Sequence, residues 1–543
     1  MTHREISPCR ASALSGRQAS APLFEAIVKH IGLDLIPFHV PGHKQGRGRG
    51  QESGIDPEFA EFLGHDALAM DLTEVPGLDD LHAPGGPIRE AEDLASELFG
   101  ADHTFFLVNG TSAGIQAAMM ATCGPGDEIL IPRDVHRSVI GGLILSGASP
   151  VYIPVAVHPE FGIPLGPVPE CLLNSLRAYP SAKLVVLTNP NYYGVTRDLR
   201  YLVNLCHQYG KIVLVDEAHG GHFAFDDALP PSGLSAGADI VVQSTHKTLG
   251  SLTQSSMLHV KGQRVDMARL RQALRILQTT SPSYILMASL DAARRRMFMR
   301  GRELVGRAVR LAERARGSIN QIIPGGCLSL PALDPARAAV DAHVGPHAGR
   351  RPVEAVCGGM CDAMRGELLL DPTKLTISFR GIGVSGYRAG EVLRERYGLQ
   401  VEFADMWNVL AMVTIADRDE DVDRLIEGIK GLSDIFPGQY LQCLQLQYLR
   451  CLQHLDDVFS APPQHLPPRQ ACLGRTEAVL LKEAAGRVSA EIVAPYPPGI
   501  PVICPGEEVT PGVIEFLTAA RELGARFQGP EDPDLTFLRV VDG

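Results

Sequence analysis

The hydrophobic pattern between about residue 60 and residue 290 consists of short apolar runs separated by helical stretches. The runs are TFFLV (104–108), EILIP (128–132), PVYIPV (150–155), KLVVLT (183–188), KIVLV (211–215) and DIVVQS (239–244). Strands that are apolar throughout are buried on both faces, which requires helices on both sides of a mostly parallel sheet. The pattern therefore predicts an α/β fold with a large, doubly wound, mostly parallel sheet, whose chemistry lies beyond the carboxyl ends of the strands.

The pattern changes beyond residue 300. An Arg-rich helical stretch, 300–316, precedes segments between 374 and 432 that read strand, helix, strand, strand, helix. These segments predict a smaller α+β domain, and residues 334–356 are expected to form an exposed insertion. The predicted divisions are 1–50, a partly disordered N-terminal segment; 51–300, the large domain; 301–440, the small domain; 441–468, a helix and linker; and 469–543, a C-terminal α+β region.

Composition and charge narrow the class of protein. The 543 residues are 45% hydrophobic and 21% charged, which is typical of globular proteins, and the formal net charge is −12. An acidic chain with 6% aromatic residues and one Trp lacks the basic footprint and the stacking platform of a nucleic-acid-binding protein. No run of 18 apolar residues occurs, so no membrane span is predicted.

Cysteine usage and the first twenty residues favour a cytoplasmic location. The eleven cysteines include no Cys-x-x-Cys pair, and Cys357 and Cys361 lack the His or Cys partners of a zinc site. No metal site is predicted, and scattered cysteines are typical of reduced thiols in the cytosol. The first twenty residues contain no apolar segment of the kind that a secretory signal needs; a disordered start is expected, and a transit peptide is the alternative.

The stretch KIVLVDEAHGGH, residues 211–222, ends an apolar strand with Asp-Glu-Ala-His. These four letters mark one class of helicase, but an NTPase also needs a glycine-rich phosphate loop that ends in Gly-Lys-Ser or Gly-Lys-Thr. The chain contains one Gly-Lys pair, Gly210–Lys211, and Ile212 follows it. The helicase interpretation is therefore disfavoured, and the acid at the end of this strand needs another explanation.

Lys247 follows the next apolar strand, within STHKTLG. Because the carboxyl ends of neighbouring parallel strands meet at one edge of a sheet, Lys247 is expected near Asp216. This pair suits pyridoxal phosphate, which forms a Schiff base with a lysine and needs a carboxylate to keep its pyridine nitrogen protonated. The alternative interpretation is a structural Asp–Lys ion pair.

Other strand ends supply groups that suit the same cofactor. Thr111 and Ser112 open a helix after TFFLV, and helix N-termini bind phosphate. Ser244 and His246 are placed to reach the same phosphate. His136, which follows EILIP, is placed to stack on the ring. Taken singly, these residues are equally compatible with helix caps or with a packing histidine.

Seven segments between about residues 38 and 508 form a series typical of one enzyme family. They are VPGHKQGRG, FFLVNGTSAGIQA, PRDVHRS, VDEAHGGH, STHKTLGSLTQSSMLHV, LQTTSPSY and APYPPGIPVICPGE. In this order they resemble the ornithine/lysine/arginine decarboxylases, pyridoxal-phosphate enzymes with the aspartate-aminotransferase-like fold, in the short form without an N-terminal flavodoxin-like domain. The resemblance implies α-decarboxylation of a basic amino acid to an amine and CO₂, in polyamine metabolism, by a homodimer or a higher homo-oligomer.

The resemblance also implies a role for each candidate residue. Lys247 would carry the cofactor, Asp216 would pair with the pyridinium, and either Lys247 or His246 would protonate the substrate Cα. His136 would stack on one face of the ring, and Ala218 would pack on the other. The phosphate would be held by Thr111, Ser112, Ser244 and His246.

Substrate contacts are implied near the C-terminus and at a subunit interface. Glu507 matches a family acid near the distal cation of the substrate, and Glu402 or Asp405 is the alternative. Thr280 or Ser281 would reach the cofactor of a neighbouring subunit. Arginine is the first expected substrate, before lysine or ornithine, because a planar guanidinium takes two parallel bonds from one carboxylate.

Two other functions remain open from the sequence. Arg380, in TISFRGIG, departs from the family pattern and would hold a substrate α-carboxylate in an aminotransferase of the same fold. A non-catalytic paralogue that acts as a regulatory partner is the second, although every expected chemical group is present.

Overall fold

The computed structural model describes residues 16–47, 54–330, 368–436 and 450–542, except residues 452 and 461. None of the helices in these ranges is long and apolar enough to cross a lipid bilayer. The predicted insertion at 334–356 lies outside the described residues, and so do residues 441–449 of the predicted helix and linker.

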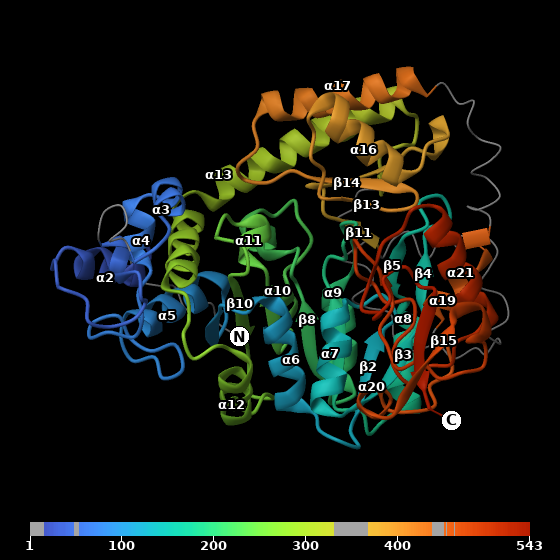
Figure 1. Cartoon of the computed structure of the whole chain (residues 1–543), viewed down its shortest axis with the longest axis horizontal. Coiled ribbons are helices and arrows are strands. Elements are labelled where there is room, and N and C mark those ends of the chain that lie inside the picture. The colour runs from blue at the N-terminus through green and yellow to red at the C-terminus, as the bar shows by residue number, and fades with distance from the viewer. Residues whose placement is uncertain are drawn as a thin grey trace.

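A seven-stranded sheet forms the centre of the large domain (Figure 1). Its order is β1 (His103–Leu107), β10 (Ser256–Val260), β9 (Ile240–Gln243), β8 (Ile212–Asp216), β6 (Leu184–Thr188), β2 (Glu128–Pro132) and β3 (Ser149–Ile153). The last five strands in this order are parallel, whereas β10 runs antiparallel to both β9 and β1. The predicted mostly parallel sheet is confirmed, and β10 is a strand that the apolar pattern did not reveal.

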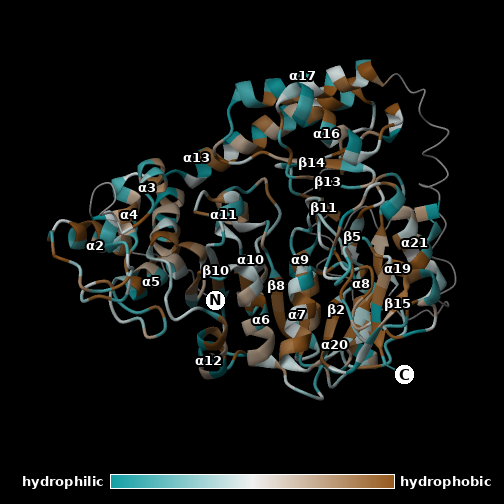
Figure 2. Cartoon of the chain, in the orientation of Figure 1, coloured by the Kyte–Doolittle hydropathy of each residue, from teal (hydrophilic) through white to brown (hydrophobic). Residues whose placement is uncertain are grey.

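Alternate residues of each strand enter two cores, one on each face of the sheet. In β6, Leu184 and Val186 pack into one core, and Val185 and Leu187 pack into the other. The first core is covered by α6 (Gly110–Thr122), α7 (Arg137–Ser146) and α12 (Met267–Leu277), and the second mainly by α5 (Pro87–Phe99), α8 (Pro169–Ala178), α9 (Leu199–Gln208) and α13 (Tyr284–Ile322). Figure 2 shows β8 and β2 in the brown of apolar side chains. Burial on both faces explains why these strands are apolar throughout.

The N-terminal segment contributes to the core of the large domain. α2 (Pro22–Ile31) buries Leu23 and Ile27 in the core that α5 and α13 also line. The backbone N–H of Leu23 donates to Asp291 of α13 over 2.9 Å, and Asp291 also accepts from the buried Arg294. This helix is therefore an ordered part of the segment that was predicted to be partly disordered.

The helix α13 leads from the large domain into the small domain (Figure 1). It runs through the predicted boundary at residue 300 and contributes to the cores of both domains. The small domain contains, in chain order, β12 (Lys374–Ser378), α16 (Gly386–Tyr397), β13 (Phe403–Ala404), β14 (Asn408–Met412) and α17 (Asp419–Ile435). This is the predicted order of strands and helices, and the strands pair antiparallel with β14 in the middle.

The C-terminal region packs against the rest of the molecule. It contains β15 (Thr476–Leu480), α21 (Pro511–Glu522) and β18 (Phe537–Val541), and β15 pairs antiparallel with β18. Its core also includes Trp407 of the small domain. The loop that carries the YPPGIP motif reaches the large domain, where the carbonyl of Gly499 accepts a hydrogen bond from the backbone N–H of Arg137. A C-terminal loop thereby comes to the carboxyl edge of the central sheet.

Candidate active site

A cavity of about 300 Å³ lies beyond the carboxyl ends of β2, β6, β8 and β9. It is lined by Gly110, Thr111, Ser112, Asp134, His136, Ser138, Thr188, Pro190, Tyr192, Asp216, Ala218, His219, Ser244, His246, Lys247, Glu402, Phe403, Tyr496, Pro497 and Pro498. All eight residues that were predicted to hold the cofactor or to act on the substrate Cα are among them. A parallel sheet gathers these residues because its strand ends lie along one edge.

Lys247 and Asp216 lie at the carboxyl ends of two neighbouring strands, as predicted. Lys247 lies in α11 (Thr245–Thr248), directly after β9, and Asp216 is the last residue of β8. Asp216 is 4% exposed, and its carboxylate accepts a 3.1 Å hydrogen bond from the backbone N–H of Ala218. Burial raises the pKa of Asp216, and it lowers the pKa of Lys247. A lysine with a lowered pKa more readily presents its neutral, nucleophilic amine.

Hydroxyl groups gather at the N-terminus of α6. Gly110 begins this helix with a φ of +74°, a conformation that favours glycine, and Thr111 and Ser112 follow it. The hydroxyl oxygens of Thr111 and Ser244 are 2.6 Å apart, and Thr111 also donates to Ser256 over 3.1 Å. The free N–H groups and the dipole of a helix N-terminus favour an anion, so this end of the cavity suits a phosphate.

His136 presents a neutral ring to the cavity. It is the N-cap of α7, and its Nδ1 accepts from the backbone N–H of Ser138 over 3.3 Å. Burial, aided by the charge of Lys247, lowers the pKa of His136 to about 4. Gly499 of the C-terminal loop lies against this ring, because a Cβ at that position would be 3.6 Å from the ring Cδ2. A flat, uncharged ring held from two sides is suited to stacking on an aromatic cofactor.

Tyr192, His219 and Lys374 are residues of this region to which the sequence reasoning assigned no role. The Nζ of Lys247 is 3.0 Å from the Nε2 of His219 and 5.7 Å from the centroid of the Tyr192 ring. On the far side of His219, its Nδ1 is 2.6 Å from the Nζ of Lys374. A usable signal existed for two of them: His219 completes the DEAH motif, and Lys374 is a charged residue at the start of an apolar strand.

Glu507, which was predicted to contact the distal cation of the substrate, is not among the residues that line this cavity. Its side chain is 0% exposed and accepts from Arg133 over 3.0 Å and from the backbone N–H of Cys504 over 2.7 Å. Arg133 is equally buried and also donates to the carbonyl of Val502. A buried arginine needs a carboxylate partner, so Glu507 ties the C-terminal region to the large domain.

Of the three acids considered for the substrate cation, Glu402 is the one that lines the cavity. It immediately precedes β13 and is exposed, and its charge, like that of Asp216, partly opposes the lowering of the Lys247 pKa by burial. Asp405 is buried, and it accepts from the hydroxyl of Tyr193 over 2.9 Å and from the backbone N–H of Trp407 over 2.7 Å. These bonds hold Asp405 in a structural role within the small domain.

Arg380 and Ser281 do not line the cavity of this chain. The guanidinium of Arg380 donates to the backbone carbonyl of Glu160 over 2.5 Å, which gives it a structural partner in place of a substrate carboxylate. Thr280 and Ser281 are exposed, next to Thr279, whose carbonyl contacts His82. Their exposure leaves them accessible to another subunit.

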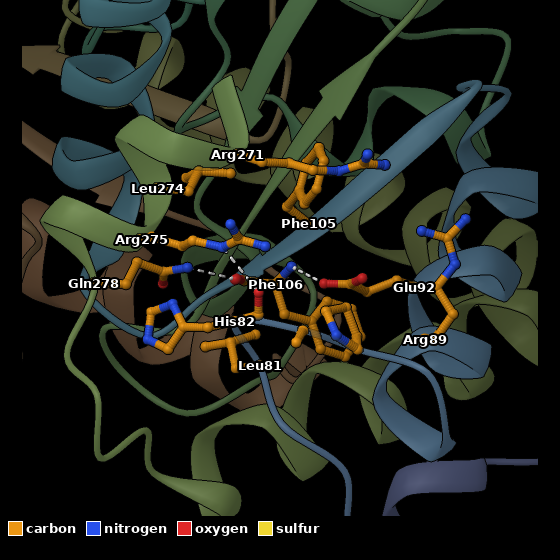
Figure 3. A pocket seen from close by; sticks show the side chains of 12 residues that line it. Leu81, His82, Arg89, Glu92, Phe105, Phe106, Arg271, Leu274, Arg275 and Gln278 are labelled. Atoms are coloured by element: carbon orange, nitrogen blue, oxygen red, sulfur yellow. Dashed lines mark hydrogen bonds between the residues drawn. The ribbon is translucent and has the colours of Figure 1, made fainter. Parts of the chain in front are cut away.

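A larger cavity, of about 580 Å³, lies beside β1 (Figure 3). It is lined by Leu81, His82, Ala83, Pro84, Arg89, Glu92, Phe105, Phe106, Arg271, Leu274, Arg275 and Gln278. Glu92 accepts from the backbone N–H of Phe106 over 3.0 Å, and burial raises the pKa of Glu92 to about 8. No lysine is among the residues that line this cavity, so it lacks the group that a pyridoxal-phosphate site requires.

The smaller cavity fits pyridoxal phosphate. Lys247 supplies an amine for the aldehyde, Asp216 supplies a buried carboxylate for the ring nitrogen, and Thr111 and its neighbours supply hydroxyls for the phosphate. The hydroxyl of Thr188, at the end of β6, is buried and has no hydrogen-bond partner among the described residues. An unpartnered buried hydroxyl that lines a cavity is expected where a ligand supplies the partner.

Solved structures share this fold. Lysine decarboxylase A from Pseudomonas aeruginosa superposes with a TM-score of 0.79 at 25% identity, over 99% of this chain and 82% of that one. The constitutive lysine decarboxylase of E. coli superposes with a TM-score of 0.79 at 23% identity, over 96% of this chain and 82% of that one. Fold and site together define a pyridoxal-phosphate enzyme with the aminotransferase-like fold.

Sequence comparison gives the family. The family model described as "Orn/Lys/Arg decarboxylase, major domain" matches residues 21–421. The model of the family's C-terminal domain matches residues 456–533. Arginine decarboxylase of Bacillus anthracis is 41% identical over 524 residues, which cover 96% of this chain and 98% of that protein. Lysine decarboxylase LdcA of Pseudomonas aeruginosa is 29% identical over an alignment of 614 positions, which covers 99% of this chain and 81% of that protein. The chain belongs to the Orn/Lys/Arg decarboxylase family, and it is a pyridoxal-phosphate-dependent decarboxylase of basic amino acids.

Proposed function

We propose that this chain removes CO₂ from arginine, in polyamine metabolism and in the cytoplasm, and that Lys247 and Asp216 carry the reaction. The observation that carries this proposal is the cavity itself, in which Lys247, Asp216 and the acid Glu402 come together from three separate segments. Arginine is favoured because the Bacillus relatives that are about 40% identical over nearly the whole chain bear the name arginine decarboxylase. The cytoplasm is favoured because the cysteines in the described ranges are free thiols.

Pyridoxal phosphate, when bound, supplies a ring that accepts the electron pair left behind as CO₂ departs. Lys247 would hold the cofactor, a task that needs a neutral amine and that burial of Lys247 favours. Asp216 would keep a proton on the pyridine nitrogen, and its burial would strengthen that ion pair because the local dielectric constant is low. After CO₂ has left, Lys247 or His246 delivers a proton to the substrate Cα.

The walls of the cavity favour loss of a charged carboxylate. Tyr192, Phe403 and Tyr496 line part of it together with Pro497 and Pro498, so this part of the lining is aromatic or apolar. A carboxylate loses its charge as it becomes CO₂, and a weakly polar surrounding stabilises the neutral product relative to the charged reactant. A substrate carboxylate placed against these residues would therefore lose its charge over a lower barrier.

Glu402 is the residue we assign to the distal cation of the substrate. A carboxylate at the rim can take two parallel hydrogen bonds from a guanidinium, and a single contact from an ammonium. Because Glu402 belongs to the small domain and Lys247 to the large domain, a substrate that bridges them would be held at both ends.

We also propose that the active unit is a homodimer. Phe38 is 93% exposed and Phe62 is 90% exposed, and Ile36 and Val40 are exposed beside Phe38. Exposed large apolar side chains are typical of an interface. We assign this interface to a second copy of this chain, which would also bring a partner to the exposed Ser281. In this arrangement Ser281 of one subunit completes the cofactor site of its partner.

The first experiment tests Lys247. Borohydride reduction of the purified, cofactor-loaded protein should fix pyridoxal phosphate to a peptide that contains Lys247, as detected by mass spectrometry. Lys247→Ala should lose this covalent attachment. A Lys247→Ala protein that still retains cofactor after reduction would show that another lysine carries it.

The second experiment tests the reaction and the substrate. Released CO₂ and keto acid are measured separately with arginine, lysine and ornithine, and kcat/KM is determined for each. We expect CO₂ without keto acid and the highest kcat/KM with arginine. Keto acid without CO₂ would contradict decarboxylation, and a clear preference for lysine or ornithine would reject arginine alone.

A further inference from the structure

A second lysine, Lys374, lies directly behind Lys247. Lys374 opens β12, is 1% exposed, and places its Nζ 2.6 Å from the Nδ1 of His219. The other ring nitrogen of His219, Nε2, is 3.0 Å from the Nζ of Lys247. The three side chains therefore form a continuous line of hydrogen bonds, with the imidazole in the middle and an amine at each end.

Hydrogen-bond chemistry limits the protonation states of this line. A neutral imidazole donates from one nitrogen and accepts at the other, whereas an ammonium can only donate. If Lys374 is the ammonium, it donates to Nδ1, and the Nε2–H of His219 donates to a neutral Lys247. If Lys247 is the ammonium, it donates to Nε2, and the Nδ1–H of His219 donates to a neutral Lys374. Each arrangement contains one ammonium. Two ammonium groups cannot both donate to His219, because a neutral imidazole has a single acceptor nitrogen.

We propose that Lys374 is a positioning residue that, through His219, takes up a proton from Lys247 and returns it. A proton passes from Lys247 to Nε2 while the Nδ1 proton passes to Lys374. Only N–H bonds form and break, the imidazole changes tautomer, and one positive charge moves from Lys247 to Lys374. The inference rests on the proposed role of Lys247, which needs a neutral amine to bind the cofactor and a proton to deliver to the substrate Cα.

The surroundings of Lys374 suit a group that both accepts and releases a proton. Burial, together with the charge of Lys247, lowers the pKa of Lys374 to about 7, although the carboxylates of Asp371 and Glu402 raise it. Asp371 is itself paired with His222, with the Nε2 of His222 3.2 Å from its carboxylate. Burial and the two neighbouring lysines hold the pKa of His219 well below its usual value, so the ring stays neutral. A pKa near the working pH gives the best balance of proton acceptance and release.

The turn that follows β6 packs against both Lys374 and His219. Gly194 has a φ of +87°, and a Cβ there would lie 2.7 Å from the Cβ of Lys374, so the backbone of this turn confines the lysine stem. The ring of Tyr192, in the same turn, packs 4.9 Å from the ring of His219. A lysine that merely filled space would need neither this confinement nor a contact with a ring nitrogen.

The experiment measures the recombination of apoenzyme with pyridoxal phosphate as a function of pH, followed by absorbance. Recombination needs a neutral Lys247, so its rate reports the pKa of that amine without any turnover. In Lys374→Met the stem is kept, but the amine that takes the proton from Lys247 through His219 is lost, so Lys247 should keep its proton to a higher pH. We expect the profile to move by about one pH unit to the alkaline side, which is about a tenfold slower rate at pH 7.

Lys211→Met is the matched control, because Lys211 is also buried, at 3% exposed, and donates to the backbone carbonyl of Pro180. It should leave the profile unchanged. A His219→Gln background separates the relay from a charge effect through space, because glutamine transfers no proton between the two amines. There, Lys374→Met should cause a much smaller further shift.

Each result bears on one claim. An unchanged profile in folded Lys374→Met, or an equal shift in the His219→Gln background, would overturn the relay. If Lys374→Met does not fold by circular dichroism, His219→Gln alone decides, since it should shift the profile with Lys374 in place, and an unshifted profile would overturn the relay. A wild-type protein that attaches no cofactor to Lys247 would instead overturn the proposed function.

Discussion

At the scale of the single residue, Asp216 shows how position changes the behaviour of a common side chain. Its carboxylate is almost fully buried at the end of β8, where burial raises its pKa, and the proposed cofactor would give it a cationic partner. Asp216→Asn keeps the shape but cannot hold a proton on the pyridine nitrogen. We expect the variant to bind cofactor and to lose on the order of 100-fold or more in kcat, as for removal of one preorganised electrostatic group. Steady-state kinetics beside a cofactor titration measure both, and undiminished turnover would remove the electron-sink argument.

Two glutamates should respond differently to the same substitution. Glu402→Gln removes the charge that we assign to the substrate cation, and kcat/KM should fall by about tenfold or more, corresponding to about 1.5–3 kcal/mol for a hydrogen bond to a charged group. Glu507→Gln leaves the buried Arg133 without its carboxylate partner, and the free energy of unfolding should fall by about 3–5 kcal/mol, with the KM for substrate unchanged. Thermal denaturation and kinetics on both variants test this contrast. A reversed pattern would return the substrate contact to Glu507.

The sequence predicted the residues at strand ends and missed those that depend on tertiary contacts. Lys247, Asp216 and His136 follow three different strands, and parallel strand ends lie at one edge, so their meeting is a consequence of the sheet. The contact between His219 and Lys374 joins the large domain to the small one, and no local pattern specifies how two domains dock. Their roles in the reaction stay predictions for the experiments above.

At the scale of the element, the apolar runs predicted the parallel strands because each run is buried on both faces. β10 was missed because it follows β9 and the short helix α11 without the helical stretch that signals a parallel crossover. It returns antiparallel between β9 and β1 and brings Ser256 to the hydroxyl of Thr111. The missed strand thus supports one wall of the cavity.

The docking of α5 on β1 predicts a dependence of stability on pH. Glu92 of α5 is buried with a pKa of about 8, above the ordinary value of 4.5, so the folded state binds a proton that the unfolded state releases between these pH values. The contribution of Glu92 to the free energy of unfolding therefore falls as the pH rises from about 4.5 to 8. The fall is about 1.4 kcal/mol for each unit by which the two pKa values differ. Glu92→Gln keeps an acceptor for the backbone N–H of Phe106 and cannot ionise. Its melting temperature should exceed that of the wild type at pH 9 and match it at pH 4. An equal pH dependence in both proteins would show that Glu92 is not the group responsible.

At the scale of the whole molecule, the cavity is assembled from all three parts of the chain. The large domain supplies Lys247, the small domain supplies Glu402, and the C-terminal loop supplies Tyr496. The family resemblance predicted that these parts belong to one enzyme, but the relative placement of the parts required the structure. The proposed dimer would add one further part, a second copy that covers the exposed apolar side chains of the N-terminal segment.

The proposed dimer is tested first by disrupting its apolar surface. Phe38→Asp combined with Phe62→Asp places charges at two positions that are about nine-tenths exposed in the single chain, so folding should be retained while association is lost. Light scattering should then report a mass near 58.5 kDa, with little activity. Leu473→Asp is the matched control, because Leu473 is 68% exposed on the C-terminal region and should leave association unchanged.

Subunit mixing tests whether each site is shared. Lys247→Ala and Ser281→Ala subunits should each be nearly inactive alone, since either change damages both sites of a symmetric dimer. In a hybrid, one site carries both changes and the other carries neither. Random reassociation of equal amounts makes half of the dimers hybrids with one intact site each, so activity should recover to about a quarter of the wild-type value. Recovery to that level requires that Ser281 act on the partner's cofactor. A mixture no more active than its parents, in material shown by native mass spectrometry to contain hybrids, would place Ser281 in the site of its own subunit or outside the reaction.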